Sequence, residues 1–218
     1  MNTLPPRVLL TGFDPFGGEA LNPSWEAVRR LEGEILRGHR IVTRQLPTSF
    51  GRSLRALRAA LASTRPALVI CVGQAGGRSR ISLERVAINV DDARIADNAG
   101  KQPVDRPIVR HGPAAYFTTL PIKAQLSALL AAGLPAEISQ SAGTFVCNHV
   151  FYGLMHALRE SPQIRAGFVH IPFLPEQAVA HAGAASLSLD TVLASLRLLV
   201  DTALTTRRDS RLAAGATH

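Results

Sequence analysis

The sequence predicts an α/β fold, a three-layer α/β/α sandwich around a twisted, mixed sheet whose strands are largely parallel. Continuous apolar runs of strand length, such as 67–72 (ALVICV), are typical of strands that are buried on both faces. Longer segments with apolar residues at helical spacing alternate with these runs, as they do when helices cover a parallel sheet. A chain of 218 residues has the length of one such domain.

The predicted strands are short apolar segments bounded by polar or turn residues. We expect them at 7–11, 41–46, 67–72, 136–140 and 167–171. Segment 81–90 is an ambiguous strand, because Glu84 and Arg85 interrupt its apolar pattern.

The predicted helices have apolar residues three and four positions apart. Asn22 followed by Pro23 is typical of an N-cap and a first helical position, and it predicts a helix that runs to about Leu36. Further helices are expected at 50–62, 121–132, 147–160 and 188–204.

The remaining segments are predicted to be irregular. Segment 91–112 is polar and without a clear period, which is typical of a functional loop or lid. No repeat or low-complexity linker divides the chain, so we expect a single α/β domain over 1–206 and a frayed tail over 207–218.

Composition argues against nucleic-acid and membrane partners. The net charge is +8, but the arginines are scattered along the chain and aromatic residues, on which bases would stack, are only 5% of it. No apolar run reaches the roughly 18 residues that a membrane span needs. The N-terminus lacks the pattern of a secretion signal, so a cytoplasmic location is predicted.

The two cysteines have different sequence contexts. Cys71 lies in an apolar strand and is predicted to be a small buried side chain. Cys147 lies in SAGTFVCNHVFY, at or just before the first turn of a predicted helix, where the helix dipole favours an anion. We therefore expect a lowered thiol pKa and a nucleophilic Cys147. The pair lacks metal-ligand spacing and the GQAGGR loop matches no phosphate-binding pattern, so neither metal nor cofactor is predicted.

A nucleophilic cysteine needs a base and a group that orients the base. His170 ends the apolar strand 167–171, at the sheet edge where ligands gather in open α/β sheets, but a structural role stays open. Glu84 is a carboxylate among apolar neighbours, which either pairs with Arg78 or Arg85 or orients an imidazole. His149, two residues beyond Cys147 on the same helix, should point away from it.

Two phenylalanines occupy a loop directly after the first strand. Phe13 and Phe16 flank an Asp-Pro pair in a segment rich in glycine. They either fold back as a loop anchor or form the wall of a small apolar pocket.

Four segments resemble the pyroglutamyl peptidase I family, the cysteine-type pyrrolidone-carboxylate peptidases. They are LLTGFDPFGGEALNPSWEA, GQAGGRSRISLERVAIN, SAGTFVCNHVFYGLMH and HIPFLPEQ, in the order of the family. The resemblance implies a catalytic triad of Glu84, Cys147 and His170. It implies five substrate-binding residues: Phe13, Phe16, Gln74, Phe145 and Val146. It also implies a role for Arg94 in polarising the substrate carbonyl.

The resemblance implies a fold related to nucleoside phosphorylases, often as a homotetramer, with no metal and no cofactor. Many relatives have tyrosine and leucine where this chain has Phe145 and Val146, a difference that bears on pocket shape rather than on the reaction. The implied activity is hydrolysis of an N-terminal pyroglutamyl residue from peptides through a thioester. The alternatives are an inactive binding protein on the same fold, a nucleoside phosphorylase-like enzyme and, last, a nucleic-acid-binding module.

Overall fold

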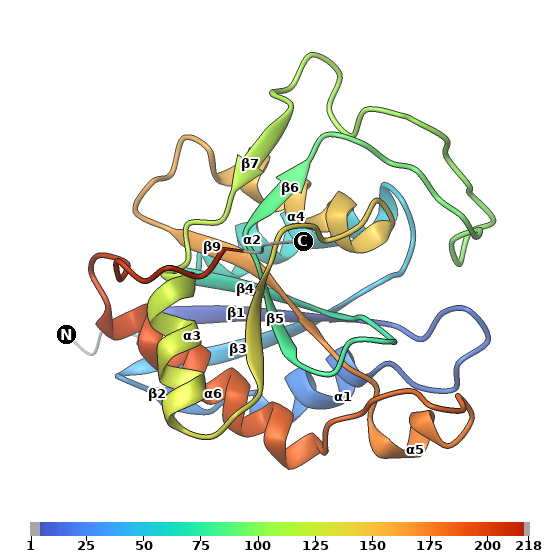
Figure 1. Ribbon diagram of the computed structural model, residues 1–218. Helices are drawn as coiled ribbons and strands as arrows, with labels where there is room; N and C mark the ends of the chain where they lie inside the picture. Colours follow the sequence, from blue (N-terminus) through green and yellow to red (C-terminus); the bar gives the residue numbers. More distant parts are fainter. Residues whose placement is uncertain (1–4, 216–218) are drawn as a thin grey trace.

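The computed structural model describes residues 5–215 and has a mixed seven-stranded sheet at its centre (Figure 1). The strand order is β2-β3-β1-β4-β9-β5-β8, and a separate pair is formed by β6 and β7. The strands are β1 Arg7–Phe13, β2 Ile35–Leu36, β3 His39–Leu46, β4 Leu68–Gln74, β5 Ile81–Glu84, β6 Val86–Ile88, β7 Ala115–Phe117, β8 Ala136–Ser139 and β9 Arg165–Ile171. In the large sheet, β2 and β3 are antiparallel, as are β5 and β9, and the other neighbours are parallel.

Helices cover both faces of this sheet. The helices are α1 Pro23–Val28, α2 Arg52–Thr64, α3 Ile122–Ala131, α4 Val146–Leu158, α5 Pro175–Ala178 and α6 Leu189–Thr205. One face packs against α1, α3 and α6, and the other packs against α2 and α4 (Figure 1). The predicted three-layer α/β/α architecture is confirmed.

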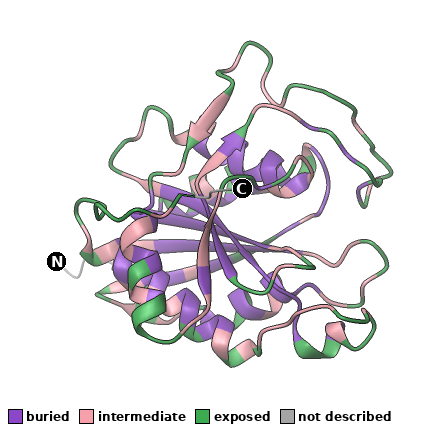
Figure 2. Cartoon of the chain, in the orientation of Figure 1, coloured by how far each residue is buried: buried purple, intermediate pink, exposed green. Residues whose placement is uncertain are grey.

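The central strands are the most deeply buried part of the molecule (Figure 2). Alternate residues of β1 serve the two layers: Val8 and Leu10 join one apolar cluster and Leu9 joins the other. This is the burial pattern of a strand covered on both sides, and it explains why the segment reads as a continuous apolar run.

The helix that begins at Pro23 is shorter than predicted. Asn22 caps it as expected, because its side chain accepts the backbone N–H of Ser24. The α-helix ends at Val28, a 3-10 turn follows, and the chain then enters β2. Gly33, just beyond the 3-10 turn, has a positive φ of 80°, a conformation that favours glycine and that ends the helical path before Leu36.

Segment 81–90 contains two strands, β5 and β6, that are separated by Arg85. β5 belongs to the large sheet, whereas β6 pairs with β7, a strand that was not predicted. The charged residues that made the segment ambiguous mark the point where the chain changes sheet.

The C-terminal segment beyond α6 contacts the body of the protein. The Asp209 carboxylate accepts the backbone N–H groups of Lys123 and Ala124 in the first turn of α3, and Arg85 donates to the carbonyl of Ala214. Residues 216–218, which complete the predicted frayed tail, lie outside the described residues. Among residues 5–215, no helix has both the length and the apolar character needed to cross a membrane.

Candidate active site

The sheet brings His170 and Glu84 together from antiparallel strands. His170 lies next to the carboxyl end of β9, and the register pairs it with Ser82 of β5. Glu84 is two residues further along β5, so its side chain points to the same face of the sheet as those of Ser82 and His170. The carboxylate and the imidazole are therefore diagonal neighbours.

Glu84 makes two short contacts through one oxygen. Its Oε1 lies 2.7 Å from His170 Nδ1 and 2.7 Å from Arg78 Nη1. The carboxylate is fully buried and His170 is nearly so. Since Nδ1 donates to Glu84, the ring keeps Nε2 for exchanging a proton with another group.

Both interpretations of Glu84 that the sequence left open therefore hold. It pairs with Arg78 and also orients an imidazole. Arg78 extends from the loop after β4 and donates to the carbonyl of Ser141 as well, so it ties that loop to the segment before α4. The sequence predicts Arg78 only as a possible ion-pair partner of Glu84.

Cys147 is the second residue of α4, as the predicted helix start requires. Its sulfur lies directly over Gly73 of β4, since a Cβ built on Gly73 would be 2.9 Å from Sγ and 2.8 Å from Phe168 Cζ. Gly73 is the register partner of His170 in the pairing of β4 with β9. The sulfur and the imidazole thus occupy the same face of the sheet.

The predicted lowering of the Cys147 pKa is wrong for this structure. Burial raises the pKa of the Cys147 thiol to about 12, the negative charge of Glu84 adds to this effect, and Arg78 opposes it. The helix start is present, but the loss of hydration on burial and the nearby charge of Glu84 outweigh it. At neutral pH the thiol is therefore protonated until a base removes its proton.

Three phenylalanines form what we call the aromatic row: Phe16, Phe145 and Phe50. The Phe16 and Phe145 rings are 6.0 Å apart, and Phe50 meets Phe145 edge-on at 5.4 Å. Phe145 is the residue before α4 and lies two positions from Cys147. Phe50 was not predicted as a site residue, and the only sequence signal for it is an aromatic side chain in the turn that opens α2.

The other predicted pocket residues occupy different settings. Phe13 is the last residue of β1 and not a loop residue as expected; it is buried, and its ring centroid lies 6.3 Å from that of Phe168. Val146 is fully buried in the same apolar cluster, which places it behind Cys147 rather than on an open surface. Gln74 ends β4, where its side-chain oxygen lies 3.4 Å from Gln177 Nε2.

A cavity of about 410 Å³ opens beside Phe145. It is lined by Asp92, Arg94, Ile95, Gly143, Thr144 and Phe145. Arg94 is exposed at this cavity, so its side chain borders the region next to the aromatic row.

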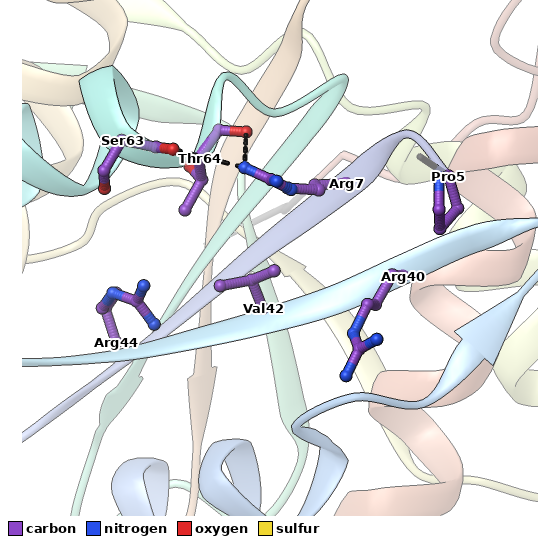
Figure 3. A pocket seen from close by; sticks show the side chains of 7 residues that line it. All are labelled: Pro5, Arg7, Arg40, Val42, Arg44, Ser63 and Thr64. Carbon is purple, nitrogen blue, oxygen red and sulfur yellow. Dashed lines mark hydrogen bonds between the residues drawn. The ribbon is translucent and has the colours of Figure 1, made fainter. Parts of the chain in front are cut away.

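A second cavity, of about 340 Å³, lies at the opposite end of the strands (Figure 3). Its lining includes Arg7, Arg40 and Arg44, and Arg7 donates to the last carbonyls of α2 at Ser63 and Thr64. None of the predicted catalytic residues lines it. Within residues 5–215, no group of three or more His, Cys, Asp or Glu side chains has an arrangement that suits a metal ion.

Comparison with known proteins gives a consistent relationship over nearly the whole chain. The model of the pyroglutamyl peptidase family matches residues 6–206. Pyrrolidone-carboxylate peptidase 1 of Ralstonia nicotianae is 61% identical, with 98% of this chain and 100% of the relative covered. The pyrrolidone-carboxylate peptidase of Escherichia fergusonii is 58% identical, with coverage of 97% and 99%.

Solved structures agree with the sequence relationship. The crystal structure of pyroglutamyl peptidase I from Bacillus amyloliquefaciens superposes with a TM-score of 0.93 at 51% identity, covering 96% of this chain and 100% of that one. A mutant pyrrolidone carboxyl peptidase from Pyrococcus furiosus gives a TM-score of 0.87 at 41% identity, with 91% and 98% covered. The chain therefore belongs to the pyroglutamyl peptidase family.

Proposed function

We propose that this protein is a cysteine exopeptidase that removes an N-terminal pyroglutamyl residue from peptides. The observation that carries the proposal is the Glu84–His170 pair, with Nδ1 and Oε1 2.7 Å apart, on the same sheet face as the Cys147 sulfur. Membership of the pyroglutamyl peptidase family supports the substrate class.

In the proposed reaction, the Cys147 sulfur attacks the pyroglutamyl carbonyl while His170 accepts the thiol proton. The C–N bond breaks, the proton passes from His170 to the departing amine, and a thioester remains on Cys147. Water then adds to the thioester carbonyl, giving one proton to His170, which returns it to the sulfur as free pyroglutamate leaves. Glu84 holds the imidazole with Nδ1 protonated throughout, as the acid does in other triads.

The start of α4 supplies the donors for the oxyanion. Within the described chain, the N-cap residue Phe145 makes no side-chain hydrogen bond to this helix, so no cap competes for its first N–H groups, including that of Cys147. In comparable sites one such donor is worth about 3 kcal/mol of transition-state stabilisation.

The proposed substrate pocket is apolar and has few polar groups. A pyroglutamyl residue has no free α-amino group, so the flat lactam needs apolar walls and a few amide partners rather than a carboxylate. We assign Phe13, Phe16, Phe145 and Val146 to the apolar wall, with Val146 and Phe13 acting from behind it, and Gln74 to the amide. Arg94 is proposed to act at the carbonyl from the rim of the adjacent cavity.

The test is hydrolysis of a pyroglutamyl fluorogenic amide by wild type and by Cys147→Ser. We expect the variant to lose at least a thousandfold in kcat, because a serine hydroxyl at this position lacks the nucleophilicity of sulfur. His170→Ala should lose nearly as much, and Glu84→Gln less, since the amide keeps the shape of the carboxylate. Equal rates for wild type and Cys147→Ser contradict the assignment of the nucleophile.

The same substrate series separates the competing functions. An inactive binding protein would show no turnover, and a nucleoside phosphorylase-like enzyme would require phosphate, whereas the proposed reaction needs only water. The family relationship favours neither alternative.

We also propose that the protein forms a homo-oligomer, and the family resemblance implies a tetramer. We further propose that it is located in the cytoplasm. The β6–β7 pair carries exposed Ile88 and Phe117, and Phe117 is 67% exposed, which suits a surface covered by another subunit. A cysteine nucleophile must stay reduced, which suits a cytoplasmic location. Sedimentation velocity measures the oligomeric state of wild type and of Phe117→Asp. A monomeric wild-type protein would contradict the proposed oligomer.

A further inference from the structure

Asp91 and His149 form a buried pair that the proposed reaction does not use. His149 Nδ1 lies 2.8 Å and 3.0 Å from the two oxygens of Asp91, and its Nε2 accepts the backbone N–H of Gly51 at 3.0 Å. Both side chains are more than nine-tenths buried. The ring therefore has its proton on Nδ1, and each ring nitrogen has one fixed partner.

The pair joins three segments that are far apart in the sequence. Asp91 lies near the start of the loop after β6, Gly51 precedes α2, and His149 lies in the first turns of α4. Asp92, the next residue, makes two hydrogen bonds with Thr144, which directly precedes Phe145. The Asp92 N–H donates to the carbonyl of Thr144, and the Thr144 hydroxyl donates to the carbonyl of Asp92. The segment that leads into the nucleophile is thus fixed to the Asp91 loop.

The same imidazole supports the aromatic row. Phe50 meets the His149 ring edge-on at 5.3 Å and meets Phe145 edge-on at 5.4 Å. The backbone N–H of His149 also donates to the carbonyl of Phe145 at 3.1 Å. The row Phe16–Phe145–Phe50 therefore ends on a ring whose orientation is set by Asp91 and Gly51.

We propose that Asp91 and His149 are positioning residues that hold Phe50 and Phe145 as a fixed wall for the flat ring of the substrate. This inference rests on the proposed function. Both ring nitrogens of His149 are already bonded, to Asp91 and to Gly51, so it takes no part in proton transfer. Its loss lets Phe50 and Phe145 change orientation while the Glu84–His170 pair, which lies on β5 and β9, stays in place.

The proposal predicts a change in KM rather than in kcat. His149→Leu keeps the volume but removes both ring hydrogen bonds, and we expect KM for a pyroglutamyl amide to rise about tenfold, the equivalent of one buried hydrogen bond, with kcat within about threefold of wild type. His149→Asn keeps a donor for Asp91 and His149→Gln keeps an acceptor for Gly51, so each should recover part of the KM. These conservative variants also serve if His149→Leu does not fold.

His156→Leu is the matched control. His156 lies on the same helix, and its Nδ1 is bonded to the Tyr116 hydroxyl at 2.9 Å, away from the aromatic row. We expect its KM to equal that of wild type. If His149→Leu changes KM no more than His156→Leu does, or lowers kcat at constant KM, the positioning role is wrong.

A second measurement keeps this result separate from the proposed function. The lactam 2-pyrrolidone, at increasing concentration, should protect Cys147 from iodoacetamide, and the protection constant should weaken about tenfold in His149→Leu, matching the KM effect. Absence of turnover by wild type, with protection intact, contradicts the peptidase function alone. Equal protection of wild type and His149→Leu contradicts the positioning role, whatever the turnover.

Discussion

At the scale of single residues, Cys147 combines a favourable position with an unfavourable environment. The start of α4 favours a thiolate, but burial and the charge of Glu84 raise the pKa of the thiol from 9.0 to about 12. In the proposed reaction, the thiol is therefore ionised by proton transfer to His170 when substrate is bound, and not as a stable ion pair in the free protein. This arrangement protects the sulfur from adventitious oxidation, which requires the thiolate.

The raised pKa predicts how the free protein reacts with iodoacetamide. A thiol whose folded pKa lies above its ordinary value stays protonated as the pH passes 9, so the labelling rate of Cys147 should keep rising, about tenfold per pH unit, from pH 7 to 10. Peptide mapping assigns the label, with Cys71 as the buried internal reference. A rate that levels off below pH 8 would show a preformed thiolate.

Gly73 leaves room for the sulfur of Cys147, the proposed nucleophile. A Cβ at this position would lie 2.9 Å from the Cys147 sulfur and 2.8 Å from Phe168 Cζ, distances at which neighbouring atoms must move. We expect Gly73→Ala to lower kcat/KM about a hundredfold, because a displacement of about 1 Å in a reacting group has that effect. Gly215→Ala is the control, since a Cβ there meets no atom within 4 Å. Equal activity of the two variants would contradict the placement of the sulfur.

At the scale of helices and strands, local sequence patterns predicted the elements that are determined by local contacts. The pattern over 147–160 placed α4, and the cap at Asn22 placed the start of α1. Elements decided by distant partners were not predictable: α1 ends early because the chain turns back into β2, and β7 exists because Ala115–Phe117 meets β6. The short strands β2 and β7 are not marked by a local sequence signal.

The N-terminus of α3 shows the same dependence on a distant segment. Pro121 provides no side-chain cap, and the Asp209 carboxylate, 86 positions from Lys123, accepts the N–H groups of Lys123 and Ala124 instead. We expect Asp209→Ala to lower the free energy of unfolding by about 1 kcal/mol, the usual cost of losing a cap, with Asp209→Asn losing less. Urea denaturation measures both, and an unchanged midpoint for Asp209→Ala would mean that the tail contributes nothing to α3.

At the scale of the whole molecule, the sequence predicted the fold class and indicated the residues of the candidate triad. It did not predict which side chains surround those residues in the folded protein. Strand and helix alternation is a pattern along the chain, and the motifs around Glu84, Cys147 and His170 are local. The direction of the Cys147 pKa shift depends instead on which side chains surround the sulfur after folding. Likewise, Phe50 and the Asp91–His149 pair acquire their places only when α2, α4 and the loop after β6 meet.

The buried thiol of Cys71 predicts that the folded state becomes less stable in alkali. Burial raises the pKa of Cys71 from 9.0 to about 12, so above pH 9 the unfolded chain releases this proton while the folded chain keeps it. The unfolded state then binds fewer protons, and the free energy of unfolding falls as the pH rises.

For Cys71 alone, this loss reaches about 2 kcal/mol by pH 10.5, at 1.36 kcal/mol per pKa unit. Cys71→Ala lacks the titrating group, so its free energy of unfolding should decrease less between pH 9 and 10.5 than that of wild type. The two decreases should differ by about this amount, whatever the stability of the variant at pH 7. Chemical denaturation at four pH values in that range measures both slopes. Parallel curves would mean that Cys71 ionises as readily in the folded protein as in the unfolded chain, and that the core around β4 admits water.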